Sequence, residues 1–178
     1  HDIPLVVDNT TSTAYLIQVL KQGADIVVNS SSKYINGSSN AISGILTDSG
    51  KFKWDKNRYP GFADYVKYGP MAFIAKLRNS LFRNMGACLA PVNAYLNIIG
   101  LETLGLRMER ECSNALELAS WIENNYPDIK VNYPGLCSSK WHEIAKKQLT
   151  NGYGAILTIR VGSKEKAFKF IDSLTIPY

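Results

Sequence analysis

Short apolar runs at the start of the chain alternate with an amphipathic stretch. Residues 4–7 and 25–28 lie in compact runs rich in β-branched side chains, the pattern of strands that are buried on both faces. Between them, apolar residues recur at helical spacing over residues 14–22, and Gly23 follows as a C-cap. A strand–helix–strand order predicts parallel strands joined by a crossover helix. The pattern therefore predicts an α/β fold with a mainly parallel sheet.

The central part of the chain predicts one more strand, an irregular insertion and two helices. Residues 41–47 have the pattern of a strand, whereas residues 48–69 are rich in Gly, Lys, Asp and aromatic residues and predict an insertion without regular structure. Apolar residues at helical spacing predict a helix over 71–85, and Pro91 opens another over 92–99.

The strongest periodicity in the sequence lies over residues 101–122, where apolar side chains recur at steps of three and four. The members of this series are Leu101, Leu104, Met108, Cys112, Ala115, Ala119 and Ile122. Such a series predicts one long amphipathic helix with a buried face. Beyond it, strands over 129–132 and 155–161 and helices over 141–149 and 164–173 predict an α+β arrangement.

Composition and charge restrict the classes of function. The chain has 178 residues, of which 46% are hydrophobic, as expected for a globular protein. Its net charge is +5, and the basic residues are scattered among acidic ones. Lys51, Lys53 and Lys56 form a short basic patch with Phe52 and Trp54 between them, but a solvated insertion is the preferred interpretation. We therefore expect no nucleic-acid partner.

The cysteines and histidines predict neither a disulfide framework nor a metal site. Cys88, Cys112 and Cys137 are odd in number and widely spaced, which suits the reducing cytoplasm. His1 and His142 form no recognisable zinc pattern with them. Every apolar stretch is shorter than the ~20 residues of a membrane helix, so we expect a soluble protein without a membrane partner.

A serine-rich loop with one lysine carries the first candidate chemistry. Residues 29–33 (NSSSK) follow the second predicted strand directly, at the strand end where open α/β sheets bind ligands. Serine hydroxyls and loop N–H groups suit a phosphate, and the amine of Lys33 can form a Schiff base with an aldehyde. Pyridoxal 5'-phosphate has both groups. Serine-rich loops with a lysine are also common on surfaces, so the pattern alone leaves both interpretations open.

Asp8 is the second candidate, at the end of the first predicted strand. A carboxylate at this sheet edge can hold a pyridine nitrogen in its protonated form, which makes the ring an electron acceptor. The alternative is that Asp8 caps a helix that begins near Ser12 or Thr13. The spacing alone does not decide between them.

Several segments together resemble one enzyme family. They are residues 6–10 (VVDNT), 23–37 (GADIVVNSSSKYING), 48–54 (DSGKFKW), 86–91 (GACLAP), 100–110 (GLETLGLRMER) and 132–136 (NYPGL). The first two are similar to the lysine signature of the cysteine and methionine metabolism family of pyridoxal-phosphate enzymes. The others are similar to its O-acetylhomoserine sulfhydrylase branch, and the likeness spans nearly the whole chain.

The resemblance implies a fold and a domain organisation. The fold is that of fold-type I pyridoxal-phosphate transferases. Residues 1–105 correspond to the C-terminal part of the cofactor domain, residues 106–125 to a long connecting helix, and residues 126–178 to an incomplete α+β C-terminal domain. Family members are well over twice as long, so we expect the chain to be an internal fragment of a homotetrameric enzyme.

The resemblance also implies site residues. Lys33 is the Schiff-base lysine, Asp8 the partner of the pyridine nitrogen, and Ser30 and Ser32 are phosphate ligands. No metal site is implied.

This chain departs from the family pattern at four positions. Ser32 stands where threonine is usual and keeps the hydroxyl. Asn29 replaces a usual histidine, Ser31 a usual alanine, and Ala90 a serine that commonly precedes the proline.

The implied reaction is a γ-replacement on O-acetyl-L-homoserine. Sulfide or methanethiol displaces acetate, and homocysteine or methionine results, as in methionine biosynthesis. Cystathionine γ-synthase and methionine γ-lyase are alternatives that share the same cofactor residues. The non-enzymatic alternative is an inactive structural fragment of such an enzyme.

Overall fold

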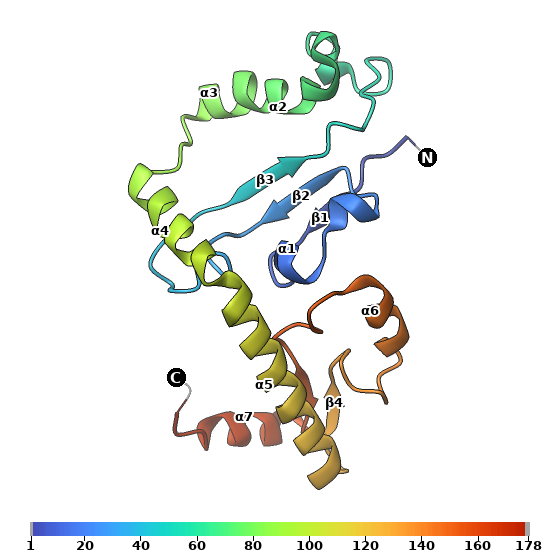
Figure 1. The fold of residues 1–178 in the computed structure, drawn as a ribbon, viewed down its shortest axis with the longest axis vertical. Helices are drawn as coiled ribbons and strands as arrows, with labels where there is room; N and C mark the ends of the chain where they lie inside the picture. Colours follow the sequence, from blue (N-terminus) through green and yellow to red (C-terminus); the bar gives the residue numbers. More distant parts are fainter. Residues whose placement is uncertain (1, 177–178) are drawn as a thin grey trace. The chain divides into compact units, whose positions relative to one another are not determined.

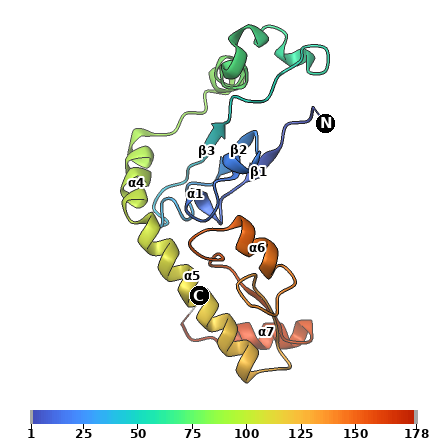
Figure 2. The same cartoon turned by 45° about the vertical axis from the view of Figure 1, so that its right-hand side comes forward.

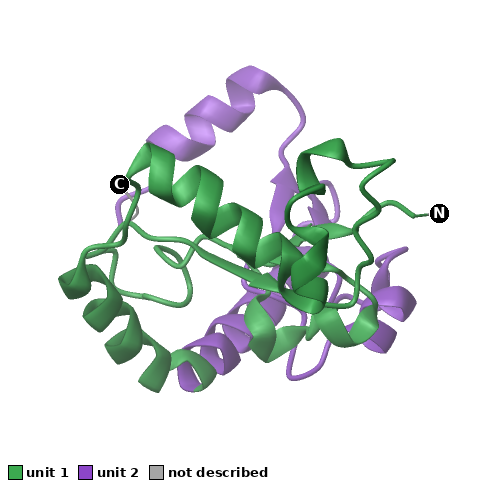
Figure 3. Ribbon diagram, turned by 90° about the horizontal axis from the view of Figure 1, so that it is seen from above, with its two compact units in different colours: residues 1–105 green, residues 106–178 purple. Residues whose placement is uncertain are grey.

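The pair of parallel strands predicted at the N-terminus is the centre of the first of two compact units. The computed structural model describes residues 2–176, and the chain divides into units of residues 1–105 and 106–178 (Figure 3). Among the described residues, no helix combines the length and the apolar character needed to cross a membrane.

The first unit is built on a three-stranded sheet in the order β1-β2-β3 (Figure 1). Strand β1 (Val6–Asp8) pairs in parallel with β2 (Ile26–Asn29), and β2 pairs antiparallel with β3 (Ile45–Asp48). The strands also lie side by side in the rotated view (Figure 2). The chain between β2 and β3 is a loop without a crossover helix, and a loop returns the chain antiparallel to the strand it has left.

The connection from β1 to β2 is not the single helix predicted over 14–22. It consists of α1 (Thr13–Leu16) and the 3-10 helix η1 (Val19–Gln22), separated where Ile17 is extended (φ −149°, ψ 125°). The carbonyl oxygen of Ile17 accepts a hydrogen bond from Asn9 Nδ2 at 3.1 Å. A tertiary hydrogen bond thus takes a carbonyl that a continuous helix would use. Gly23 closes η1 in the left-handed conformation (φ 103°), as predicted.

One face of the sheet carries a buried apolar cluster. Val19, Ala24 and Val27 are buried together. The partly buried residues packed against them are Val7, Ile17 and Leu20. The apolar residues of the crossover segment therefore share one buried face, as predicted, although the helix is broken.

The predicted insertion contains short 3-10 turns and an aromatic cluster. Its turns are η2 (Pro60–Phe62) and η3 (Val66–Met71). The ring of Trp54 stacks on Phe62 with centroids 4.0 Å apart and on Phe73 at 5.6 Å. The predicted helix over 71–85 is present as three consecutive segments: α2 (Ala72–Lys76), the π-helical η4 (Leu77–Phe82) and α3 (Arg83–Met85).

The two helices predicted over 92–99 and from residue 101 onwards are present, but the boundary between them lies three residues further along the chain. Helix α4 (Pro91–Glu102) ends before Thr103, and α5 (Leu104–Asn125) begins after it. Leu101 belongs to α4 and is 47% exposed, so its place in the apolar series is wrong. The remaining series does form the buried face of α5, at Met108, Cys112, Ala115, Ala119 and Ile122.

Gly100 of α4 lies directly against the backbone of the loop that follows β2. A Cβ at this position would overlap the carbonyl oxygens of Ile35 and Asn36. Only glycine permits this approach, so α4 braces the loop by backbone contact.

The second unit packs around a buried tyrosine. Strands β4 (Lys130–Asn132) and β5 (Thr158–Arg160) pair antiparallel. The helices after α5 are α6 (His142–Gln148) and α7 (Lys164–Asp172). Tyr133 is fully buried with Ala115, Ala119 and Leu136. Its hydroxyl donates to the carbonyl oxygen of Gly154 at 2.8 Å.

Replacement of Gly100 by alanine is expected to destabilise the first unit. The new methyl group meets two backbone carbonyls that cannot rotate away, and overpacking of this kind costs about 1–3 kcal/mol. Gly105→Ala is the matched control, because a methyl there meets only the Tyr15 ring at 3.3 Å. Urea unfolding followed by circular dichroism should show a lower midpoint for Gly100→Ala alone. Equal midpoints would contradict the close approach.

The stability of the second unit should depend on pH in the alkaline range through Tyr133. Burial raises the pKa of Tyr133 from 10.0 to about 12. Above pH 10 the unfolded chain loses this proton while the folded chain keeps it, so the free energy of unfolding should fall until about pH 12.

The variant Tyr133→Phe separates the ionisation of Tyr133 from the ionisation of other groups at alkaline pH. It should lack the alkaline loss, and near neutral pH it should cost about 1–2 kcal/mol because the Gly154 carbonyl loses its donor. Urea midpoints measured at several pH values test both statements, and parallel alkaline profiles for the two proteins would refute the first.

Candidate cofactor site

The parallel pairing of β1 and β2 brings the two predicted parts of the site to one edge of the sheet. Asp8 is the last residue of β1 and stands in register with Val28 of β2. The ladder continues one step further, because Asn9 N donates to Val28 O at 2.9 Å. Asn29 Nδ2 then donates to Asn9 O at 2.8 Å. The two strand ends are therefore joined where the serine-rich loop begins.

The carboxylate of Asp8 is exposed and held by the residue two positions further on. Its Oδ1 accepts a hydrogen bond from Thr10 N at 2.9 Å, as in an Asx turn. The hydroxyl of Thr10, and next its N–H group, lower the pKa of Asp8 below the ordinary aspartate value. Asp8 is thus ionised at neutral pH, the state that a protonated ring nitrogen requires.

The alternative role of Asp8 as a helix cap is wrong. The N-cap of α1 is Ser12, and no side chain makes a capping hydrogen bond there. Thr13 N donates instead to the backbone oxygen of Asn9 at 2.9 Å.

The loop after β2 is anchored at its first residue. Ser30 N donates to Thr10 Oγ1 at 2.8 Å, so Thr10 contacts both Asp8 and Ser30. Among the described residues, the structure records no hydrogen-bond partner for the hydroxyl of Ser30. This hydroxyl is therefore available to a ligand.

Lys33 lies within a turn that starts from Ser30. Its backbone N donates to Ser30 O at 3.3 Å, and its carbonyl oxygen accepts from Gly37 N at 2.7 Å. The side chain of Lys33 is exposed. The amine is thus carried on a hydrogen-bonded turn that begins next to the Asp8–Thr10 pair.

Ser32, the fourth predicted residue, is bound within the protein. Its Oγ accepts from Ser43 N at 2.7 Å and donates to Ser43 O at 3.2 Å. A hydroxyl has one proton, and a phosphate oxygen needs a donor. Contact of Ser32 with a phosphate therefore requires the bond to the Ser43 carbonyl to break, and its role as a phosphate ligand stays a prediction.

A buried polar network lies beneath the loop. Ser31 is fully buried and donates to Ser43 Oγ at 2.7 Å. Asn97 of α4 also donates to Ser43 Oγ, at 2.8 Å. The network joins α4 to the loop near Gly100. Asn97 Oδ1 of this network, and Nδ2 of the buried Asn36 in the same loop, have no partners among the described residues.

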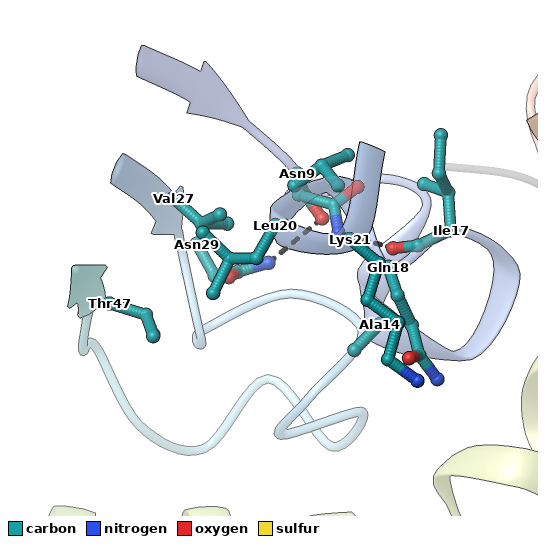
Figure 4. A pocket seen from close by; sticks show the side chains of 10 residues that line it. Asn9, Ala14, Ile17, Gln18, Leu20, Lys21, Val27, Asn29 and Thr47 are labelled. Carbon is teal, nitrogen blue, oxygen red and sulfur yellow. Dashed lines mark hydrogen bonds between the residues drawn. The ribbon is translucent and has the colours of Figure 1, made fainter. Parts of the chain in front are cut away.

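A mainly apolar pocket of about 300 Å³ opens on the face of the sheet that carries Val27 (Figure 4). Its walls include Ile17, Leu20 and Val27. Successive side chains of a strand point to opposite faces of the sheet. Val27 therefore lies on one face, and Val28 with its partner Asp8 lies on the opposite face. The pocket therefore lies away from the Asp8 carboxylate.

The groups at the sheet edge fit pyridoxal phosphate. An ionised carboxylate suits a protonated pyridine nitrogen, an exposed lysine suits an aldehyde, and an unpartnered serine hydroxyl suits a phosphate. In the part of the chain that the structure describes, no group of three or more His, Cys, Asp or Glu side chains is arranged to bind a metal ion.

Sequence reasoning missed three residues of this site. Thr10 had a signal, because an Asp at a strand end often accepts a hydrogen bond from the backbone N–H two residues further on, as in an Asx turn. Asn97 is a polar residue in an apolar helical segment, three positions before Gly100. The contact of Ser43 with Ser31 and Ser32 has no signal in the sequence.

Comparison with known proteins identifies the family. The sequence model described as Cys/Met metabolism PLP-dependent enzyme matches residues 1–178. The homocysteine/cysteine synthase of Saccharomyces cerevisiae is 41% identical over 185 residues, which cover 97% of this chain and 42% of the yeast protein. The chain thus spans less than half the length of this relative.

Solved structures agree with the sequence match. The O-acetylhomoserine sulfhydrylase of Wolinella succinogenes superposes with a TM-score of 0.81 at 46% identity, over 98% of this chain and 50% of the other. A putative O-acetylhomoserine (thiol)-lyase of Campylobacter jejuni, solved with N'-pyridoxyl-lysine-5'-monophosphate, gives a TM-score of 0.87 at 34% identity, over 99% and 47%. The predicted α/β fold of type I pyridoxal-phosphate transferases is confirmed. The chain belongs to the family of pyridoxal-phosphate-dependent enzymes of cysteine and methionine metabolism.

Proposed function

We propose that the protein containing this chain is a pyridoxal-phosphate-dependent transferase acting on O-acetyl-L-homoserine. Sulfide or methanethiol forms the new bond at the γ carbon, and acetate leaves from it. The observation that carries the proposal is the joined end of β1 and β2, which presents the ionised Asp8 and the Lys33 turn at one sheet edge. The name of the Wolinella succinogenes relative, an O-acetylhomoserine sulfhydrylase, supports the substrate, and that of the yeast relative, a homocysteine/cysteine synthase, supports the product.

Each residue has a defined task in this proposal. When bound, pyridoxal phosphate supplies an aldehyde that captures amines and a ring that accepts electron pairs. The Lys33 amine holds the aldehyde between turnovers and afterwards carries protons between the α and β carbons of the substrate. Asp8 keeps the ring nitrogen protonated, and the Ser30 hydroxyl donates to the phosphate.

We also propose an assembly state, a substrate type and a location for the protein. We infer a homotetramer that acts on small-molecule substrates. Cys88, Cys112 and Cys137 are free thiols, which supports a cytoplasmic location.

The alternatives predict different products. Cystathionine γ-synthase and methionine γ-lyase use the same cofactor chemistry, so the residues of this site do not separate them. Assay with O-acetylhomoserine and sulfide, then with cysteine as the thiol, and with methionine alone distinguishes the three reactions. An inactive structural fragment would turn over none of the substrates.

Lys33 should be the residue that traps the cofactor. Borohydride reduction of the protein with pyridoxal phosphate, followed by peptide mapping, should place a pyridoxyl group on Lys33. Lys33→Ala should remove both this label and turnover, because no other group supplies the amine. Lys21→Ala is the matched control, since Lys21 is an exposed lysine on the pocket face. A label on another lysine in the unmodified protein would contradict the assignment.

Ser30 and Ser32 should differ when each is replaced by alanine. Ser30→Ala should weaken cofactor binding about threefold to tenfold with little change in stability, because only a ligand uses its hydroxyl. Ser32→Ala should lower the free energy of unfolding by about 1–3 kcal/mol, because the N–H of Ser43 loses its acceptor, whereas the Ser43 carbonyl keeps the backbone N–H of residue 32 as a donor. Fluorescence titration with the cofactor and urea unfolding test the two effects. Identical behaviour of the two variants would overturn this division.

A further inference from the structure

We propose that Thr10 is a positioning residue, which orients the carboxylate of Asp8 and ties it to Ser30 at the start of the Lys33 turn. The proposal rests on the function proposed above and extends it to a residue that does not itself contact the cofactor.

Thr10 uses two different atoms for its two contacts. Its backbone N–H donates to Asp8 Oδ1 at 2.9 Å, and its Oγ1 accepts from Ser30 N at 2.8 Å. Asp8 and Ser30 lie on neighbouring strand ends, so one residue bridges the two strands beyond their last ladder bond. Asp8 and Ser30 therefore share a common support.

The hydroxyl of Thr10 can accept one hydrogen bond and donate another at the same time. A threonine hydroxyl has one proton and two lone pairs, and the Ser30 N–H occupies one lone pair. The proton then remains free to point at the carboxylate. Consistent with this, the hydroxyl of Thr10 is the largest influence that lowers the pKa of Asp8. The branched Cβ restricts the χ1 angle and so fixes where Oγ1 lies.

The bridge acts on two cofactor-facing groups at once. Asp8 is exposed, and without the Thr10 hydroxyl only the hydrogen bond from Thr10 N would hold its carboxylate. Ser30 also accepts a hydrogen bond from Lys33 N at 3.3 Å, so a shift of Ser30 moves the lysine turn. Loss of Thr10 Oγ1 is therefore expected to disturb the ring-nitrogen partner and the lysine together.

The experiment compares Thr10→Val, Thr10→Ser and the neighbouring control Thr11→Val in the protein that carries this chain. Valine keeps the branched shape but loses donor and acceptor, whereas serine keeps both. The first readout is the Asp8 carboxyl pKa in the cofactor-free protein, from NMR with labelled aspartate and assignment by Asp8→Asn. The second is the dissociation constant of pyridoxal phosphate from fluorescence titration.

The expected result is a higher Asp8 pKa in Thr10→Val and a dissociation constant raised about threefold to tenfold. Thr10→Ser should restore both values, and Thr11→Val should change neither. A purely structural role would lower the urea midpoint without moving the Asp8 pKa, and that outcome would overturn the proposal. So would a raised pKa with unchanged cofactor binding. Thr10→Ala replaces the valine variant if that variant does not fold.

Cofactor binding and the Asp8 pKa are separate measurements on this protein. If the unsubstituted protein binds no pyridoxal phosphate, the proposed function is wrong and the coupling to the cofactor falls with it. The Asp8 pKa is measured without cofactor, so the contact between Thr10 and Asp8 is judged independently.

Discussion

The parallel pairing of β1 with β2 is the constraint on which the site depends. It places the carboxyl ends of both strands at one edge, so that Asp8 and the Lys33 turn begin side by side. A slip of one residue in this register would turn Asp8 to the opposite face of the sheet and separate Thr10 from Ser30. The register is held by the apolar face of the sheet, where Val7 and Val27 pack into the core with Val19 and Ala24.

The serine-rich loop is held from two sides. On one side Thr10 receives the first loop N–H, and on the other Ser43 binds Ser31 and Ser32. Helix α4 adds the close approach at Gly100 and the hydrogen bond from Asn97. A lysine that must meet a fixed aldehyde gains from such bracing, because a site works only when its supporting groups are themselves fixed.

This bracing has an energetic cost that the structure shows. Buried polar groups are favourable only when their donors and acceptors are paired. Ser43 Oγ accepts from both Ser31 and Asn97, whereas Asn97 Oδ1 and Asn36 Nδ2 remain unpaired among the described residues. A polar network under the loop is therefore less stabilising than its number of hydrogen bonds suggests, and its value lies in fixing the loop against α4.

The family, the α/β class and the place of Asp8 and Lys33 at strand ends could be predicted from the sequence, because short apolar runs and local motifs depend on neighbouring residues. The buried face of α5 could also be predicted, since helical spacing is a local property. Three features became visible only in the folded chain: the break in the crossover at Ile17, the end of α4 at Glu102, and the hydrogen bonds between Ser32 and Ser43. Each of these features depends on a partner distant along the chain or on how the chain turns between elements. The spacing of apolar residues in the sequence does not reveal such contacts. Thr10 is the intermediate case, because its turn with Asp8 is local whereas its bond to Ser30 exists only once the two strands have paired.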